Sequence, residues 1–145
     1  MIHEASCSDG VLAHVQRVPW AMNHTPSTAL LTKLESETYF TGLVWMQPQT
    51  SGVLRVTFAP GARTVWHTHP HGQTLLIVSG HGLVQKRGEA AIAFGAGDVV
   101  SIEAGEEHWH GAAPDSLMVH FALQAGKTVW LAKVTDEEYG AEDQK

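Results

Sequence analysis

From about residue 52 onward the chain alternates short apolar runs with glycine and proline. The stretch 52–58, GVLRVTF, illustrates the pattern, because two sets of residues alternate along it: Leu54, Val56, Phe58 and Val53, Arg55, Thr57. Successive side chains of a strand point to opposite faces of a sheet, so this period of two predicts a β-strand. The following PGA is a turn sequence.

Six further stretches repeat this design. Each is rich in Val, Ile, Thr and aromatic residues and ends at a turn sequence; they are RTVWHTH, QTLLIVSG, HGLVQKRG, AAIAFGAGDVVSI, EAGEEHWHGA and SLMVHFALQ. Many short strands without an intervening helical period are typical of a β-sandwich or barrel. We therefore predict an all-β fold.

The two ends of the chain differ from this pattern. Residues 1–35 predict an irregular arm or an added strand. Near the other end Thr135 precedes Glu138 by three residues, the spacing of a capping box, which predicts one short helix turn. No internal repeat or linker divides the sequence, so we expect a single domain over residues 1–145.

Composition narrows the function classes. Hydrophobic residues make up 43% and charged residues 17%, the balance of a globular domain. The formal net charge of −6 and the absence of a basic stripe argue against nucleic-acid binding. No apolar stretch approaches the length of a membrane span, so we expect neither a membrane anchor nor a secretory signal. The lone Cys7 fits a cytoplasmic protein. We expect small molecules, or copies of the chain itself, as partners.

Histidine is concentrated in one part of the chain, since seven of the ten histidines lie between His67 and His120. His67 and His69 are two residues apart, as are His108 and His110, so each pair points to one face of its strand. Gln73 begins the next strand and can point back to the first pair. Imidazole nitrogens and a carboxamide oxygen form a site suited to a divalent first-row metal.

Several roles remain open for the individual histidines. These histidines could also be surface or core residues of the strands without a role in metal binding. The occurrence of two His-x-His pairs argues against this alternative. Three roles are open for His110: it could be a fifth metal ligand, it could hold another ligand in place, or it could carry a proton. We favour the role of proton carrier. His120 shares a face with Met118 and Ala122 and is either a hydrogen-bonded core histidine or an acid/base group facing a cavity. The turn residues His71 and His81 are expected to be exposed.

The spacing of these residues resembles the two motifs of the cupin family. The first runs Gly61, five residues, His67-x-His69, three residues, Gln73, six residues and Gly80. The second runs from Gly97 through Gly105 and two further residues to His108. The resemblance covers about residues 52–123, and it implies a double-stranded β-helix, a jelly-roll barrel that holds its metal inside.

Within that family the stretches FAPGARTVWHTHPHGQTL, HWHGA and KVTDEEY are similar to small bacterial cupins with manganese-dependent hydroxynitrile lyase activity. This resemblance implies one divalent transition metal per chain, with Mn favoured over Fe, Ni, Zn or Cu. The implied ligands are His67, His69, Gln73 and His108. His110 and His120 would then line the pocket as acid/base residues.

Gln73 stands where most cupins have glutamate. A site of three histidines and a glutamine has no negative ligand, so its ion keeps the full +2 charge and favours Lewis-acid chemistry over oxygen activation. The leading hypothesis is a metal-dependent lyase or related enzyme that acts on a small carbonyl-derived substrate. The resemblance implies a hydroxynitrile lyase, which would cleave a cyanohydrin to an aldehyde and cyanide. A dioxygenase or other oxidoreductase, and a non-catalytic module that binds a metal or small ligand, are the alternatives.

The tryptophans bear on assembly. Trp66 and Trp109 alternate with the histidines and are expected to face away from the metal, toward a second sheet or a partner subunit. Trp45 and Trp130 are interpreted as packing residues. Residues 73–79 are apolar on both faces, which requires cover on both sides. We predict a homodimer or homotetramer.

Overall fold

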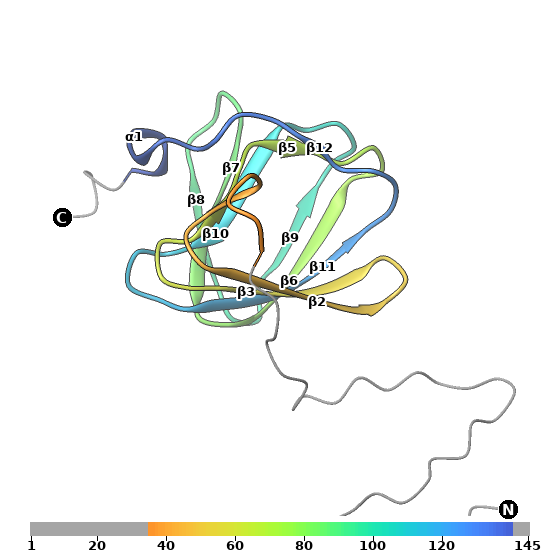
Figure 1. Cartoon of the computed structure of the whole chain (residues 1–145), viewed down its shortest axis with the longest axis horizontal. Helices are drawn as coiled ribbons and strands as arrows, with labels where there is room; N and C mark the ends of the chain where they lie inside the picture. The colour runs from red at the N-terminus through yellow and green to blue at the C-terminus, as the bar shows by residue number, and fades with distance from the viewer. Residues whose placement is uncertain (1–34, 141–145) are drawn as a thin grey trace, which may run out of the picture.

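The alternating stretches form the strands of two curved antiparallel sheets in the computed structural model, which describes residues 35–140 (Figure 1). One sheet has the order β2-β3-β11-β6-β9. The other has the order β1-β4-β10-β5-β12, with β7 paired to both β10 and β8. Strands are the main regular structure of the described chain, which has a single helix of four residues. This confirms the all-β prediction and fits a jelly-roll barrel.

The elements have the following bounds: β1 (Phe40–Thr41), β2 (Val44–Thr50), β3 (Val53–Phe58), β4 (Arg63–Thr64), β5 (His67–Thr68), β6 (Gln73–Ser79), β7 (His81–Lys86), β8 (Ile92–Gly95), β9 (Val99–Ile102), β10 (His108–Ala112), β11 (Met118–Gln124), β12 (Val129–Trp130) and α1 (Asp136–Tyr139).

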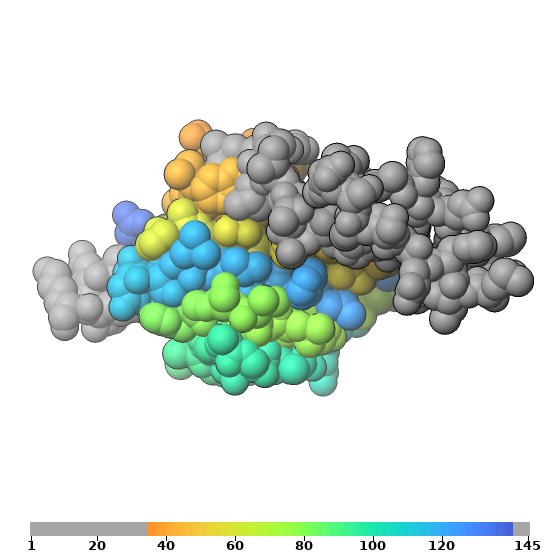
Figure 2. Space-filling model, turned by 90° about the horizontal axis from the view of Figure 1, so that it is seen from below, coloured from red at the N-terminus to blue at the C-terminus, as the bar shows by residue number. Residues whose placement is uncertain are grey.

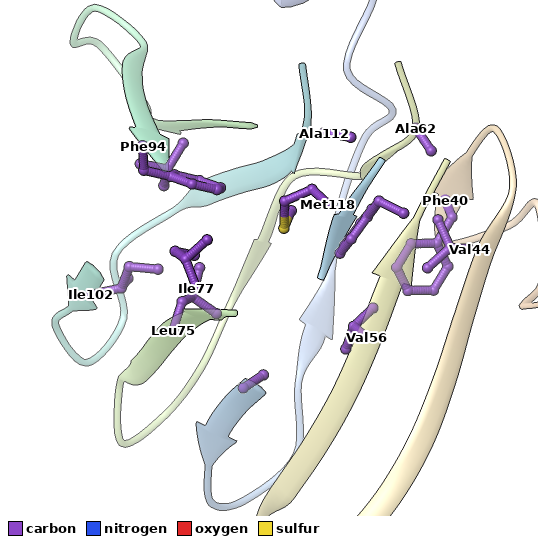
Figure 3. Close-up of a cluster of buried hydrophobic side chains, with 13 residues drawn as sticks. Phe40, Val44, Val56, Ala62, Leu75, Ile77, Phe94, Ile102, Ala112 and Met118 are labelled. Carbon is purple, nitrogen blue, oxygen red and sulfur yellow. The ribbon is translucent and has the colours of Figure 1, made fainter. Parts of the chain in front are cut away.

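The hydrophobic core lies between the sheets. Alternation along β6 buries Leu75 and Ile77 and leaves Val78 48% exposed on the outer face. In β11 the same alternation buries Met118, His120 and Ala122, the three residues that the sequence predicts to share one face. Figure 3 shows Leu75, Ile77 and Met118 within one cluster of buried side chains. A histidine therefore occupies an inward position of β11 between two apolar inward residues, Met118 and Ala122.

Strand pairing brings the two histidine pairs together. β10 lies beside β5, and the Cα of His108 is paired with that of His67. His110, two residues further along β10, is also buried. His67 and His108, the first residues of the two His-x-His segments, are 41 residues apart in sequence. The two segments are nevertheless neighbours in one sheet.

Two parts of the barrel differ from the sequence pattern. The stretch 90–102 reads as one apolar segment but forms two strands, β8 and β9, which belong to different sheets. Asp98 accepts a hydrogen bond from the backbone of Gly95 at 2.8 Å, which closes the turn between them. The barrel also begins before residue 52, because β2 pairs with β3 along its length.

The C-terminal segment covers the outer side of β10. Thr135 and Glu138 form the predicted capping box at the start of α1. Trp66 and Trp109 pack with Val134 and Tyr139 from this segment and are buried. The expectation that a second sheet or a partner subunit covers these tryptophans is therefore wrong; the end of the same chain covers them.

The predicted arm, residues 1–35, lies outside the described residues except for Glu35. Between residues 35 and 140 no helix is long and apolar enough to cross a membrane.

Candidate metal centre

Backbone carbonyls orient two of the imidazoles. Nδ1 of His67 donates to the carbonyl of Val65 at 2.8 Å, and Nδ1 of His108 donates to that of Glu106 at 2.9 Å. A carbonyl oxygen can only accept, so the hydrogen of each neutral ring lies on Nδ1. Nε2 of both rings therefore keeps its lone pair. The two ring centroids are 4.2 Å apart, so these lone pairs belong to one site.

Gln73 brings an oxygen to the same place. Gly72, with a φ of +78°, reverses the chain just before β6, and a side chain there would meet the backbone of Ile102. Oε1 of Gln73 lies 3.1 Å from Nε2 of His108. Both atoms are acceptors, so they have no hydrogen to share. A cation bound by both would satisfy this buried contact.

His69 supplies a further nitrogen. Its Nδ1 lies 3.2 Å from the hydroxyl of Thr128, and its buried Nε2 has no hydrogen-bond partner. Its ring centroid is 4.9 Å from that of His67 and 5.5 Å from that of His108. An unpartnered polar atom inside a protein indicates a missing partner such as an ion.

Within the described residues, His67, His108 and His110 form a group that could hold a metal ion, since their ligand atoms all lie within 4.8 Å of one another. The structure also brings the other implied ligands, His69 and Gln73, to this cluster. Nitrogen and oxygen donors of this kind suit a divalent first-row metal. Because His110 is also close, a role as a fifth ligand stays open.

His110 and His120 form a second pair beside the first. Nε2 of His120 lies 3.2 Å from Nδ1 of His110, and the ring centroids are 4.9 Å apart. The remaining ring nitrogens, Nε2 of His110 and Nδ1 of His120, are buried without a hydrogen-bond partner. Both rings line the cavity that also reaches His67 and His69. The two rings thus contact each other at the wall of this cavity.

Burial keeps these imidazoles neutral. Desolvation and, to a smaller extent, the neighbouring His108 together lower the pKa of His69 to about 4. Desolvation also lowers the pKa of His120 to about 4. The pKa values of His67 and His110 lie well below the ordinary value of 6.5 for the same main reason. At neutral pH each ring therefore has a lone pair available for a metal or a proton.

The cavity has a volume of about 200 Å³ and two kinds of wall. Its polar lining residues are Thr64, His67, His69, Gln73, His110, His120, Gln124 and Thr128. Its apolar lining residues are Phe40, Met46, Leu54, Val56, Phe58, Ala122 and Trp130. The arrangement suits a small molecule with one polar end and one apolar end.

Trp130 is part of this site rather than only a packing residue. Its ring centroid is 5.2 Å from that of His67, and its ring stacks on Tyr39 at 4.6 Å. The predicted packing role of Trp130 is confirmed, since the residue packs against the hydrophobic core, and the residue also lines the cavity. Its place follows from the pairing of β12 with β5, where Trp130 is opposite His67. The sequence near Trp130 contains no indication of this contact.

The remaining described histidines lie outside the cavity lining. His71 is exposed in the turn before Gly72. His81 is also exposed, with Nε2 3.1 Å from a carboxylate oxygen of Asp115. Both positions agree with the exposure expected for turn residues.

Comparison with known proteins identifies the family. A family model described as a cupin domain matches residues 54–123. The structure superposes on a cupin-like protein from Thermotoga maritima with a TM-score of 0.73 and 40% sequence identity, covering 80% of this chain and 96% of that one. The chain belongs to the cupin family. A more distant structure, the polyketide cyclase RemF from Streptomyces resistomycificus, shares the cupin fold with a TM-score of 0.62 and 15% identity, covering 86% of this chain and 94% of that one.

A curated relative comes from Granulicella tundricola, where the protein is named (R)-mandelonitrile lyase. This cupin is 54% identical to it over 88 residues, which are 58% of this chain and 67% of the relative.

Proposed function

We propose that this cupin is a metal-dependent lyase that cleaves a small aromatic cyanohydrin to an aldehyde and cyanide. In this proposal His67, His69, Gln73 and His108 hold one divalent ion, with Mn²⁺ favoured. The observation that carries the metal site is the contact of two acceptors, Oε1 of Gln73 and Nε2 of His108, at 3.1 Å. The similarity to a protein named (R)-mandelonitrile lyase supports the reaction class.

The ligand set supports lyase chemistry over oxygen chemistry. All four proposed ligands are neutral, because the histidines are unprotonated and Gln73 is an amide. A divalent ion held there supplies Lewis-acid stabilisation of negative charge on an alcohol or carbonyl oxygen. Three of the proposed ligands, His67, His69 and Gln73, line the cavity, so the substrate oxygen would lie on that side of it.

The apolar side of the cavity supports an aromatic substrate. Met46 and Leu54 lie on the wall formed by β2 and β3, and Trp130 lies beside His67. An aryl ring placed against these side chains leaves its hydroxyl-bearing carbon toward the histidines. Burial of such a ring is favourable by about 25 cal/mol for each Å² of apolar surface.

The histidine pair supplies the proton transfer. Cleavage removes the proton of the hydroxyl, forms the C=O bond and breaks the bond to the nitrile carbon. The electron pair leaves with cyanide, which takes up a proton to become HCN. We assign the removal of the hydroxyl proton to His120, with His110 as its neighbour at 3.2 Å. A proton taken by one ring can be shared with the other and returned to cyanide.

The test measures metal content, cleavage and oxygen use on the same protein. We expect protein stripped of metal to be inactive toward racemic mandelonitrile and Mn²⁺ to restore release of benzaldehyde without oxygen consumption. His67→Ala should lose both metal and activity. His81→Ala, which changes an exposed histidine, is the matched control and should keep both.

Three results would contradict the proposal. Oxygen consumption coupled to turnover would favour a dioxygenase. A metal-loaded protein that binds small aromatic ligands but cleaves no cyanohydrin would favour a binding module. Unchanged metal content in His67→Ala would remove the proposed site.

A further inference from the structure

The carboxamide of Gln73 has two ends of similar shape and opposite chemistry. Its oxygen can bind a cation, whereas its NH₂ group can only donate hydrogen bonds. A glutamine ligand therefore needs a neighbour that selects the end facing the centre. A carboxylate ligand has no such need, because its two oxygens are equivalent.

Gln124 is the neighbour of Gln73 that makes this selection. The two residues are Cα partners across β6 and β11, so their side chains extend to the same side of the sheet. Nε2 of Gln73 donates to Oε1 of Gln124. With its NH₂ group held there, Gln73 turns Oε1 toward Nε2 of His108.

Thr128 in turn orients Gln124. Nε2 of Gln124 donates to the hydroxyl oxygen of Thr128 at 3.5 Å. The same oxygen lies 3.2 Å from Nδ1 of His69. A hydroxyl oxygen has two lone pairs and can accept from both. If Nδ1–H of His69 donates to Thr128, Nε2 of His69 keeps its lone pair for the centre.

We propose that Gln124 and Thr128 are positioning residues: they aim the oxygen of Gln73 and the Nε2 lone pair of His69 at the metal centre. The inference rests on the proposed function, because it takes Gln73 and His69 as ligands. A single path of hydrogen bonds runs from Gln73 through Gln124 and Thr128 to His69. Residues that orient ligands in this way commonly account for 10- to 100-fold in metal affinity.

The first test removes the shared acceptor. Thr128→Val keeps the shape of the side chain but not its oxygen, and we expect the affinity for Mn²⁺, measured by chelator competition, to fall about 10-fold. Thr128→Ser restores a hydroxyl and should return the affinity to within about twofold of the parent. Thr50→Val, which removes an exposed hydroxyl from β2, is the matched control and should leave the affinity unchanged.

The second test separates orientation from packing. Gln124→Met keeps the length of the side chain and removes its hydrogen bonds, so Mn²⁺ affinity should fall about 10-fold in the Gln73 protein. In the Gln73→Glu background no amide needs orienting, and the same substitution should change the affinity by less than about threefold. A loss of packing would weaken binding equally in both backgrounds, so the double-mutant cycle isolates the orienting contact.

The outcomes distinguish this inference from the proposed function. If the parent protein binds no Mn²⁺, or if Gln73→Ala binds it as tightly as the parent, the proposed site itself fails. If Gln73→Ala weakens binding while Gln124→Met and Thr128→Val do not, only the positioning role is overturned. Equal losses in the two backgrounds of the cycle also overturn it. Urea unfolding of each metal-free variant verifies that the barrel is intact.

Discussion

At the scale of single residues, the site depends on which atom of each side chain faces the cavity. The carbonyls of Val65 and Glu106 take the Nδ1 hydrogens of His67 and His108 and leave Nε2 bare. In the second pair, the nitrogens without a partner belong to His110 and His120. Hydrogen bonds thus decide which ring nitrogen of each buried histidine is left free to face a ligand.

His120→Ala tests the proton carrier. We expect full metal occupancy, because His120 is not among the proposed ligands, and a fall in the rate of mandelonitrile cleavage of about 10²-fold or more. Metal analysis and initial rates on the same sample provide the measurement, with His81→Ala as the control. Loss of metal would make His120 a ligand, and retention of both metal and rate would assign the proton transfer to His110.

Gln73→Glu tests the neutral ligand set. The added negative charge should keep Mn²⁺ bound at least as tightly as in the parent and slow cyanohydrin cleavage, because it lowers the effective charge of the ion. Rates at saturating Mn²⁺ decide the question. A variant faster than the parent would disprove the role we give to the glutamine.

At the scale of elements, the C-terminal segment supports the strands that carry the ligands. Arg63 donates to Asp136 at 2.7 Å and to the carbonyl of Val134 at 3.0 Å. Glu138 accepts from the indole of Trp66 at 3.1 Å. These contacts hold α1 against the outer side of the sheet that contains β5 and β10.

Tyr139→Phe measures the strength of this attachment. The hydroxyl of Tyr139 donates to the carbonyl of Ala112 in β10 at 2.6 Å, and the residue is buried. Its removal leaves that carbonyl without this donor, so we expect the free energy of unfolding in urea to fall by about 1 kcal/mol. The same change at Tyr39, which is 39% exposed, is the control. An unchanged midpoint in Tyr139→Phe would show that the hydrogen bond contributes nothing.

At the scale of the whole molecule, one face of the five-stranded sheet has no cover from the described chain. Figure 2 shows β3, β11, β6 and β9 side by side on this face, as yellow, blue, green and teal bands. Leu76 is 37% exposed, Val78 48% and Val99 62%. Contiguous exposed apolar side chains of this kind are typical of an interface.

We therefore predict that the chain associates with copies of itself as a homodimer or homotetramer through this face. Light scattering at micromolar concentration should give a mass that is a multiple of 15.7 kDa. Val78→Lys, which adds a charge to the face, should shift the population toward the single chain. A lone 15.7 kDa species for the parent would refute the prediction.

The buried histidines also make the stability of the metal-free protein depend on pH. The pKa values of His69 and His120 fall from 6.5 to about 4 on folding, so between these values the unfolded chain binds more protons than the folded one. Their contribution to stability is complete above pH 6.5 and is lost as the pH falls toward 4. Urea unfolding at pH 7.5 and at about pH 5 measures the loss.

His120→Leu removes one of these groups and should reduce the difference in unfolding free energy between the two pH values. An unchanged difference would contradict the assignment of this pH dependence to the buried histidines.

Local patterns in the sequence determined the strands and part of the site. Alternation placed Met118, His120 and Ala122 together on one face of β11, and the capping-box spacing located α1. The two His-x-His pairs marked the residues that the fold brings together. These features depend on neighbours within a few positions along the chain, where strand and helix geometry fix the direction of each side chain.

Only the tertiary structure decided which distant residues complete the site and cover its outer side. Trp130 lies beside His67 because β12 pairs with β5, and Gln124 faces Gln73 because β11 pairs with β6. Tyr139 and Val134, rather than a partner subunit, bury Trp66. Pairing between strands far apart in sequence has no local period, so no pattern along the chain contains it.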